Sequence, residues 1–201
     1  MKVSYNWILE LVDVDWPPEE MARRLTLAGT ACETVINMAE RFDGMVVGEV
    51  LSVKPVPKAD KLKLAEVKVG ADTLQIICGA PNVAQGQKVA VALIGARLPS
   101  GAVLEKVSKF GVDSSGMLLS EAELELSADH SGIIELPRDA KVGQALAEAL
   151  MMKDYSLEFE LTPNRPDSIS EIGIAREVAA LSGKTVTGPE INVVEVNEKS
   201  A

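Results

Sequence analysis

The sequence predicts an α+β composite in which a small all-β barrel is inserted into a smaller helical host. Helical spacing of hydrophobic residues is found mainly near the two ends of the chain, whereas short strands separated by turn residues dominate the middle. Neither end is long enough to build a stable core alone, so the two ends should fold together. With 201 residues, 47% of them hydrophobic, the chain can bury the cores of both parts.

Two short helices are expected at the N-terminal end, over residues 6–12 and 18–28. The residues that share the buried face are Trp7, Ile8 and Leu11 in the first and Met21, Leu25 and Ala28 in the second. Pro18 suits the first turn of the second helix, and Gly29 can end it in the left-handed conformation. A strand should follow over 32–38.

The C-terminal end is expected to add one strand and one long helix. Leu157, Phe159 and Leu161 alternate with polar residues, as in a half-buried strand that can pair with strand 32–38. Pro166 and an N-cap at Asp167 or Ser168 should start the helix, with Glu171 in its first turn and Gly183 at its end. The expected buried stripe is Ile174, Val178 and Leu181.

The middle of the chain has the pattern of a barrel or sandwich. Strands are expected over 45–53, 62–69, 74–78 and 88–93, separated by turns rich in glycine and proline. Ser120 and Glu123 form a capping-box signature for a helix over 121–126, and a second helical stretch covers 143–151.

These elements predict a domain organisation with one insertion. The host is formed by 1–39 together with 152–190, and the barrel occupies 40–151. Residues 191–201 would begin a linker to further domains, since 190–196 resemble a strand that has no partner in this sequence.

Charge limits the kinds of partner. Twenty basic against thirty acidic residues give a net charge of −10, which excludes binding of nucleic acid by bulk charge. Residues 40–150 hold twelve of the twenty basic residues, so a polyanion site would have to be local to that segment. The sequence has neither the pattern of a signal peptide nor an apolar run long enough to cross a membrane, which predicts a cytoplasmic protein without a membrane partner.

No catalytic or metal-binding set is predicted. Cys78 could act as a nucleophile with His130 as base and Asp129 beside it, but Cys78 ends a hydrophobic strand pattern and 129–132 reads as a surface turn. We therefore expect a buried structural thiol. Cys32, Cys78 and His130 are too few for a metal cluster, and Asp60, Asp113, Glu121 and Glu123 lack the spacing of a metal loop.

Three short stretches of sequence in the middle segment are similar to a known domain family. Residues 57–62 (Pro-Lys-Ala-Asp-Lys-Leu), 78–83 (Cys-Gly-Ala-Pro-Asn-Val) and 111–121 together resemble the tRNA-binding domain with an oligonucleotide-binding (OB) fold that is fused to several aminoacyl-tRNA synthetases. The resemblance implies a five-stranded barrel that binds looped RNA across one face and its rim loops. The candidate RNA-binding residues are Lys54, Lys58, Lys61, Lys63, Lys106, Lys109 and Phe110, the lysines for phosphates and Phe110 for a base.

The flanks resemble the β subunits of bacterial phenylalanine–tRNA ligases. The similar stretches are 4–8 (Ser-Tyr-Asn-Trp-Ile), 24–29, 161–168 (Leu-Thr-Pro-Asn-Arg-Pro-Asp-Ser) and 173–180. This resemblance implies a split, winged-helix-like host interrupted by the tRNA-binding barrel, at the start of a much longer subunit. It also implies tRNA, an α subunit in an α2β2 tetramer and the remaining β domains as partners. ATP and magnesium would belong to the parent enzyme, and no cofactor to this fragment.

Two alternatives stay open. The barrel departs from the family blocks at Val56, Phe110 and Leu119, so the chain could instead be a structural protein-interaction domain whose barrel does not bind RNA. In the host, Arg165 or Arg176 could contact nucleic acid, but Arg165 is better placed to pair with Asp167 in a structural role.

Overall fold

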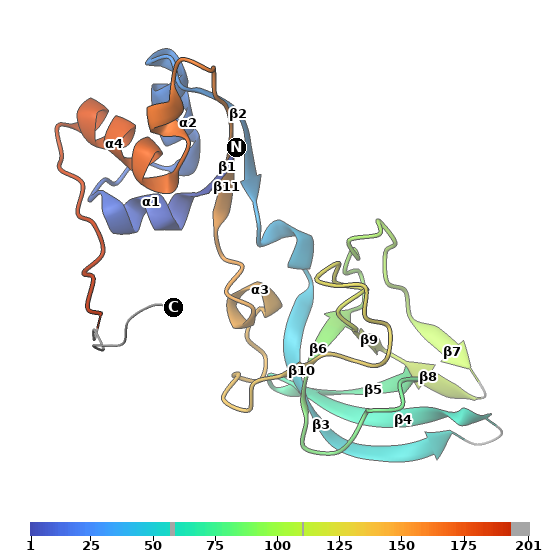
Figure 1. Ribbon diagram of the computed structural model, residues 1–201. Helices are drawn as coiled ribbons and strands as arrows, with labels where there is room; N and C mark the ends of the chain where they lie inside the picture. Colours follow the sequence, from blue (N-terminus) through green and yellow to red (C-terminus); the bar gives the residue numbers. More distant parts are fainter. Residues whose placement is uncertain (57–58, 110, 194–201) are drawn as a thin grey trace, which may run out of the picture. The chain divides into compact units, whose positions relative to one another are not determined.

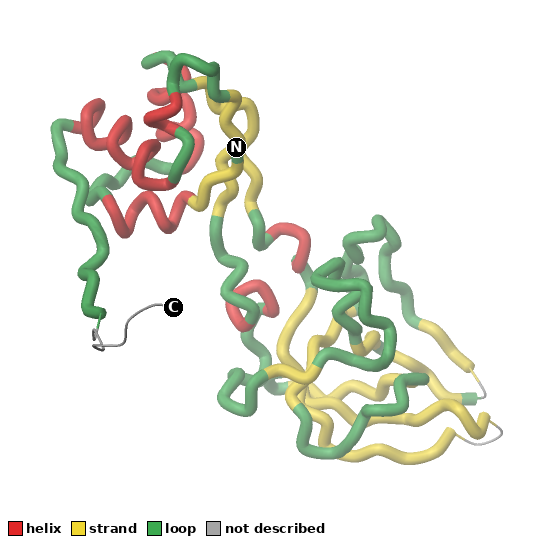
Figure 2. The backbone as a smooth tube through the Cα atoms, in the orientation of Figure 1, coloured by secondary structure: helices red, strands yellow, loops and turns green. Residues whose placement is uncertain are grey.

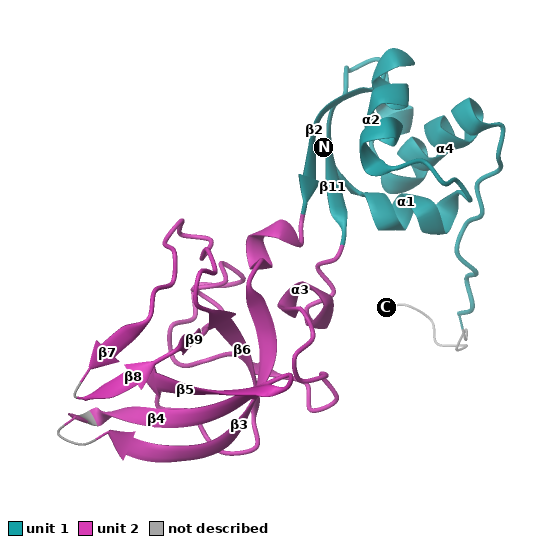
Figure 3. Cartoon of the chain, turned by 180° about the vertical axis from the view of Figure 1, so that it is seen from behind, with its two compact units in different colours: residues 1–37, 154–201 teal, residues 38–153 magenta. Residues whose placement is uncertain are grey.

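The computed structural model describes residues 1–56, 59–109 and 111–193, and divides the chain into two compact units (Figure 1, Figure 2). Unit 1 comprises residues 1–37 and the chain from Asp154 onward, and unit 2 comprises Met38–Lys153 (Figure 3). Lys58 and Phe110 lie outside the described residues. In the part of the chain that is described, no helix is both long and apolar enough to span a membrane.

Unit 1 contains a three-stranded antiparallel sheet assembled from both ends of its sequence. The strand order is β1 (Lys2–Ser4), β11 (Tyr155–Glu160) and β2 (Ala31–Asn37). Leu157 pairs with Val3 on one side and with Val35 on the other. The expected pairing of the strand near 157 with the strand near 32 is therefore confirmed, whereas β1 was not predicted.

Three helices pack with this sheet: α1 (Tyr5–Leu11), α2 (Pro18–Leu27) and α4 (Glu171–Ser182). One core joins them, because Ile8, Leu25, Leu157 and Ile174 are each fully buried in the same cluster. Residues from both ends of the chain are thus needed to complete this core, as the length argument predicted. Gly29 and Gly183 follow their helices with the expected positive φ, +98° and +69°.

Four details of unit 1 were predicted wrongly. Trp7, Ala28 and Leu181 are exposed, Trp7 to 54%, because each lies at the edge or end of a short helix whose buried stripe is narrower than expected. The N-cap of α4 is Ser170, whose side chain accepts a hydrogen bond from the Gly173 amide at 3.0 Å. Pro166–Ser168 instead forms a separate 3-10 turn, η2.

The turn before α4 is held by Arg165. Its guanidinium lies 2.8 Å from the Asp167 carboxylate, as predicted, and also 2.8 Å from that of Glu177 on α4. Hydrogen bonds to these carboxylates lower the pKa of Asp167 and raise that of Arg165. Arg165 therefore serves a structural role here, whereas Arg176 is exposed.

Unit 2 contains a nearly closed five-stranded antiparallel barrel. Its strands are β3 (Met45–Val56), β4 (Ala59–Val69), β5 (Asp72–Cys78), β6 (Lys88–Leu93) and β9 (Gly116–Leu118). In space the order is β5-β4-β3-β6-β9, and β10 (Glu135–Leu136) pairs with the other end of β6. The barrel is confirmed, and β3 and β4 extend further toward their shared turn than predicted.

Two hydrogen bonds join β5 to the residues just before β9 and help to close the barrel. The Ser115 amide donates to the Gln75 carbonyl at 2.9 Å, and the Ile77 amide donates to the Ser114 hydroxyl at 3.1 Å. A hairpin of β7 (Val107–Lys109) and β8 (Val112–Ser114) extends from the chain just before β9.

The expected helices of unit 2 are replaced by shorter structures. The capping-box hydrogen bonds between Ser120 and Glu123 are present, but the segment forms turns because Glu125 adopts a positive φ of +52°. The stretch 143–151 contains only the four-residue helix α3 (Leu146–Ala149), and Glu40–Phe42 forms a 3-10 turn, η1. No strand forms over 190–193, and the remainder of the expected strand lies outside the described residues.

Candidate nucleic-acid interface

The outer face of β4 and β5 is polar along most of its length and apolar at one end. The pairs across these strands are Lys68 with Thr73, Glu66 with Gln75 and Leu64 with Ile77. Alternate residues point outward because side chains on a strand alternate between faces, and Ala65, Val67 and Ile76 are fully buried on the inner side. A ligand crossing this face would meet leucine and isoleucine at the end near Cys78.

Two hairpins flank that apolar end. Lys63 pairs with Cys78, the last residue of β5, so the start of β4 extends beyond the end of β5. The bond from Ile77 to Ser114 brings the base of the β7–β8 hairpin to the same end. Figure 1 shows the strands of both hairpins, β3–β4 and β7–β8, reaching the same side of the barrel. The face between β4–β5 and two rim hairpins is where OB-type barrels bind oligonucleotides.

Three of the candidate lysines already have partners. Lys54 lies 3.4 Å from the Glu66 carboxylate, and Lys106 lies 2.7 Å from that of Asp113. The Lys63 ammonium donates to the backbone carbonyls of Pro81 at 2.8 Å and Val83 at 3.3 Å. Lys63 therefore holds the loop after β5, and a phosphate would have to compete with these contacts.

Two candidate lysines are available for a ligand. Lys61 and Lys109 are exposed and have no hydrogen-bond or ion-pair partner within the described part of the chain. Lys68, which sequence reasoning did not select, is likewise exposed, but it stands opposite Glu49 of β3 and its charge helps to lower the pKa of that carboxyl. The alternation of β4 places it on the outer face, which could have identified it.

The carboxylates that hold the paired lysines are stabilised in their charged form. A hydrogen bond from Ser52 is the main cause that lowers the pKa of Glu66, with Lys54 adding to it. Hydrogen bonding from Lys106 lowers the pKa of Asp113 in the same way. These carboxylates therefore stay ionised near neutral pH and keep competing with phosphate for their lysines.

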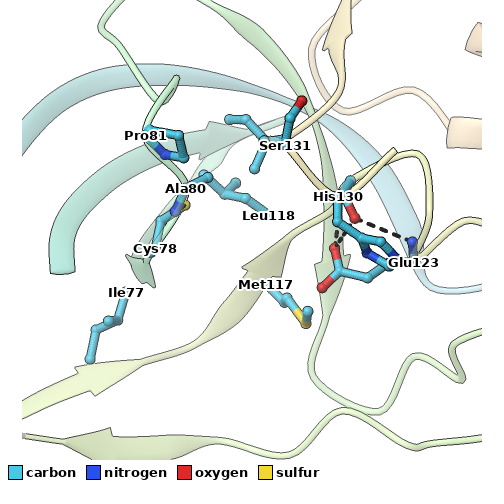
Figure 4. A pocket seen from close by; sticks show the side chains of 13 residues that line it. Ile77, Cys78, Ala80, Pro81, Met117, Leu118, Glu123, His130 and Ser131 are labelled. Atoms are coloured by element: carbon cyan, nitrogen blue, oxygen red, sulfur yellow. Dashed lines mark hydrogen bonds between the residues drawn. The ribbon is translucent and has the colours of Figure 1, made fainter. Parts of the chain in front are cut away.

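Cys78 and His130 line the same cavity, of about 330 Å³, without forming a catalytic pair (Figure 4). Burial raises the pKa of the Cys78 thiol, which disfavours the thiolate that nucleophilic attack needs. Its sulfur accepts a hydrogen bond from the Ala80 amide at 3.4 Å, and no hydrogen bond in the described structure joins it to the exposed His130. The prediction of a buried thiol is confirmed.

The acidic residue in this cavity has a structural partner. Glu123 Oε2 accepts hydrogen bonds from the Ser120 amide at 2.7 Å and hydroxyl at 2.8 Å. The described residues contain no cluster of three or more histidine, cysteine, aspartate or glutamate side chains that could hold a metal ion.

Comparison with known proteins assigns the barrel to a family. A family model described as "Putative tRNA binding domain" matches residues 45–145, half of the chain. The matched segment covers every strand of the barrel and the β7–β8 hairpin.

Similarity to individual proteins extends over nearly the whole chain. The phenylalanine–tRNA ligase β subunit of Pseudomonas fluorescens is 44% identical over 194 residues, 96% of this chain and 24% of the relative. That of Syntrophus aciditrophicus is 42% identical over 97% of this chain and 24% of its own length. That of Moorella thermoacetica is 44% identical over the full chain and 27% of its own length.

The chain thus spans about a quarter of the length of these curated relatives. The flanking stretches that suggested this relationship, among them 161–168, lie in unit 1, outside the family-model match. The chain belongs to the tRNA-binding domain family and is similar throughout to the N-terminal region of phenylalanine–tRNA ligase β subunits.

Proposed function

We propose that this chain is the non-catalytic tRNA-binding and scaffolding region at the start of a phenylalanine–tRNA ligase β subunit. The observation that carries the proposal is the pair of partner-free lysines, Lys61 and Lys109, on the two hairpins that flank the β4–β5 face. The family match of the barrel and the similarity of both units to such subunits support it.

The proposed domains follow from this assignment. An OB-fold tRNA-binding domain occupies 40–151, and a winged-helix-like host combines 1–39 with 152–190. The antiparallel sheet and three helices of unit 1 are consistent with such a host. Residues 191–201 begin a linker to the rest of the subunit.

The parent enzyme would act in the cytoplasm as an α2β2 tetramer that attaches phenylalanine to its tRNA with ATP and magnesium. The β subunits to which this chain is similar are about four times its length. In this proposal the α subunit carries the aminoacylation centre, and this region contributes tRNA contacts and packing against other β domains.

The mechanism of binding is electrostatic attraction limited to a few contacts. Each phosphate neutralised by a lysine releases condensed counterions, so affinity falls as salt rises. With Lys61 and Lys109 as the two contacts, we expect a slope of log affinity against log salt between about −1.4 and about −1.8. Recruitment of all six candidate lysines would steepen the slope to about −4 or beyond. Lys58 and Phe110 remain candidates of this site.

The test is a salt titration of tRNA binding by the 201-residue chain and charge-reversal variants. Lys61→Glu combined with Lys109→Glu should weaken binding and flatten the slope. Lys141→Glu is the matched control, because this exposed lysine lies near Gly143, at the opposite end of β4 from Lys61. Binding that is absent, or that is insensitive to salt, would contradict the proposal.

A second function is favoured by a specific observation: Lys54, Lys63 and Lys106 are engaged within the protein. A barrel whose lysines mainly stabilise its own loops could be a structural protein-interaction domain that does not bind RNA. It predicts no measurable affinity for tRNA at low salt.

A further inference from the structure

The seam between β5 and β9 contains two cavities with a common wall. The first, of about 330 Å³, is the one lined by Cys78 and His130, and the second, of about 240 Å³, lies toward the β7–β8 hairpin. Ile77 of β5 and Met117 of β9 line both of them. Both side chains are partly exposed and are drawn in Figure 4.

The second cavity has apolar walls and a charged rim. Its walls are Ile77, Leu104, Val107 and Met117, and Val107 is 40% exposed. Lys109 stands at the rim, exposed and without a partner among the described residues. The Ser114 hydroxyl is already used, since it donates to the Gly116 carbonyl and accepts from the Ile77 amide.

We propose that this cavity binds one unpaired nucleobase of an RNA, with Lys109 contacting the adjacent phosphate. The proposal rests on the proposed tRNA-binding function and names the feature of RNA that the barrel selects. Partly exposed aliphatic walls can cover the face of a flat base, and a free lysine beside them can neutralise the backbone that carries it.

The cavity is lined by one basic and one acidic residue, so charge alone does not explain how it would select RNA. Glu105 also lines this cavity and repels phosphate, which offsets part of the attraction of Lys109. Contact with the apolar walls must therefore supply much of the selectivity. A base inside a duplex has its faces stacked and cannot enter, so the cavity favours looped or single-stranded segments.

Two exposed valines four residues apart, Val107 at the start of β7 and Val103 before it, provide a matched test. Val107 lines the cavity, whereas Val103 is 49% exposed and does not. Val107→Glu and Val103→Glu add the same charge, so any general repulsion of RNA is common to both variants. The probe is a fluorescently labelled, unmodified transcript of a bacterial phenylalanine tRNA, and dissociation constants are measured by anisotropy at low salt.

We expect Val107→Glu to bind this transcript roughly tenfold more weakly than Val103→Glu, because its carboxylate would enter the cavity and repel the phosphate beside Lys109. A single-stranded oligoribonucleotide should compete with the transcript, and a blunt RNA duplex should not. Met117→Ala removes part of the cavity wall without adding charge and should weaken binding relative to Met151→Ala, a change at an 89% exposed methionine.

The outcomes separate the two proposals. If the wild-type chain binds tRNA and the two valine variants bind equally, the nucleobase site is refuted while tRNA binding stands. If the wild-type chain binds no tRNA, both proposals fail. Far-ultraviolet circular dichroism of each variant establishes that a loss of binding is not a loss of folding.

Discussion

The close approach of Gly143 and Gly70 should make Gly143 one of the least replaceable residues of unit 2. A Cβ atom at Gly143 would lie 2.6 Å from Cα and 2.8 Å from N of Gly70, so it would collide with backbone rather than with a flexible side chain. The same segment is bound to β3 by hydrogen bonds from the Gly143 amide to the Val47 carbonyl, 2.8 Å, and from the Val47 amide to the Gln144 carbonyl, 3.0 Å.

The expected destabilisation has two parts. Gly143 has a φ of +86°, and placing alanine in a left-handed conformation costs about 1–2 kcal/mol. Relief of the collision by backbone shifts adds about 1–3 kcal/mol. Gly143→Ala should therefore lower the free energy of unfolding of unit 2 by roughly 2–5 kcal/mol.

Substitutions at two other glycines distinguish the contribution of conformational strain from that of the backbone collision. Gly86 has nearly the same φ, +87°, but an added Cβ has no atom within 4 Å, so Gly86→Ala tests conformational strain alone. A Cβ added at Gly70 would lie 3.8 Å from Gly143 Cα, an ordinary contact distance, so Gly70→Ala also introduces no collision. Both changes should cost about 1–2 kcal/mol or less.

The assay is urea unfolding, with hydrogen exchange of peptides from β3 to assign the transition to unit 2. Peptides from α4 in unit 1 serve as an internal reference. If Gly143→Ala is no more destabilising than Gly86→Ala, the collision does not control stability, and the reasoning is refuted.

Three further predictions concern unit 1, the cysteines and the loop after β5. Glu20 accepts hydrogen bonds from Arg23 and Arg24 that lower its pKa to about 2, so Glu20→Gln, but not Glu19→Gln, should destabilise the chain at neutral pH. A carboxyl whose pKa is lowered in the folded chain stabilises the fold at pH values above its ordinary pKa of 4.5, and this stabilisation is lost as pH falls toward 2. The difference in unfolding free energy between the wild-type chain and Glu20→Gln, measured by urea unfolding, should therefore disappear over that range. A difference that stays constant with pH would contradict the prediction. Cys32 is half-buried and Cys78 is buried, so Ellman's reagent should modify Cys32 first. The Cys32→Ser variant should then react with the reagent only when the chain unfolds. Rapid labelling of Cys78 in the folded variant would disprove this. The Asn82 side chain makes hydrogen bonds of 2.8 and 2.9 Å to the backbone of Ile133. Asn82→Ala should therefore lower the free energy of unfolding by roughly 1–3 kcal/mol, measured by urea unfolding. An unchanged urea midpoint would show that these bonds do not stabilise the fold.

Local patterns predicted the strands well because burial alternates regularly along them. Leu157 and Phe159 are buried, as the period of two required, and the strand that contains them pairs as expected. The short helices were harder, since a helix of seven residues, such as α1, samples too few turns to define its buried face. Trp7 was misplaced for this reason.

Elements that depend on distant contacts could not be read from the sequence. β1 is only three residues long and exists because it pairs with β11, more than 150 residues away. The turns over 121–126 replaced a helix although their capping hydrogen bonds formed, because Glu125 adopts the left-handed conformation. A capping box fixes where a turn begins and does not determine how far a helix continues.

The candidate site differs from its sequence prediction for an electrostatic reason. Six lysines were expected to be candidate phosphate contacts, but Lys54 and Lys106 form ion pairs with Glu66 and Asp113, which stand opposite Ser52 and Ser108 in the strand pairing. Since both carboxylates have lowered pKa values, acidification to mildly acidic pH does not release these lysines. An RNA must therefore either displace an ion pair or bind where cations are free. The second route requires no rearrangement, and in the proposed complex it would direct the backbone toward the apolar end of the β4–β5 face, where Ile77 lines the proposed nucleobase site.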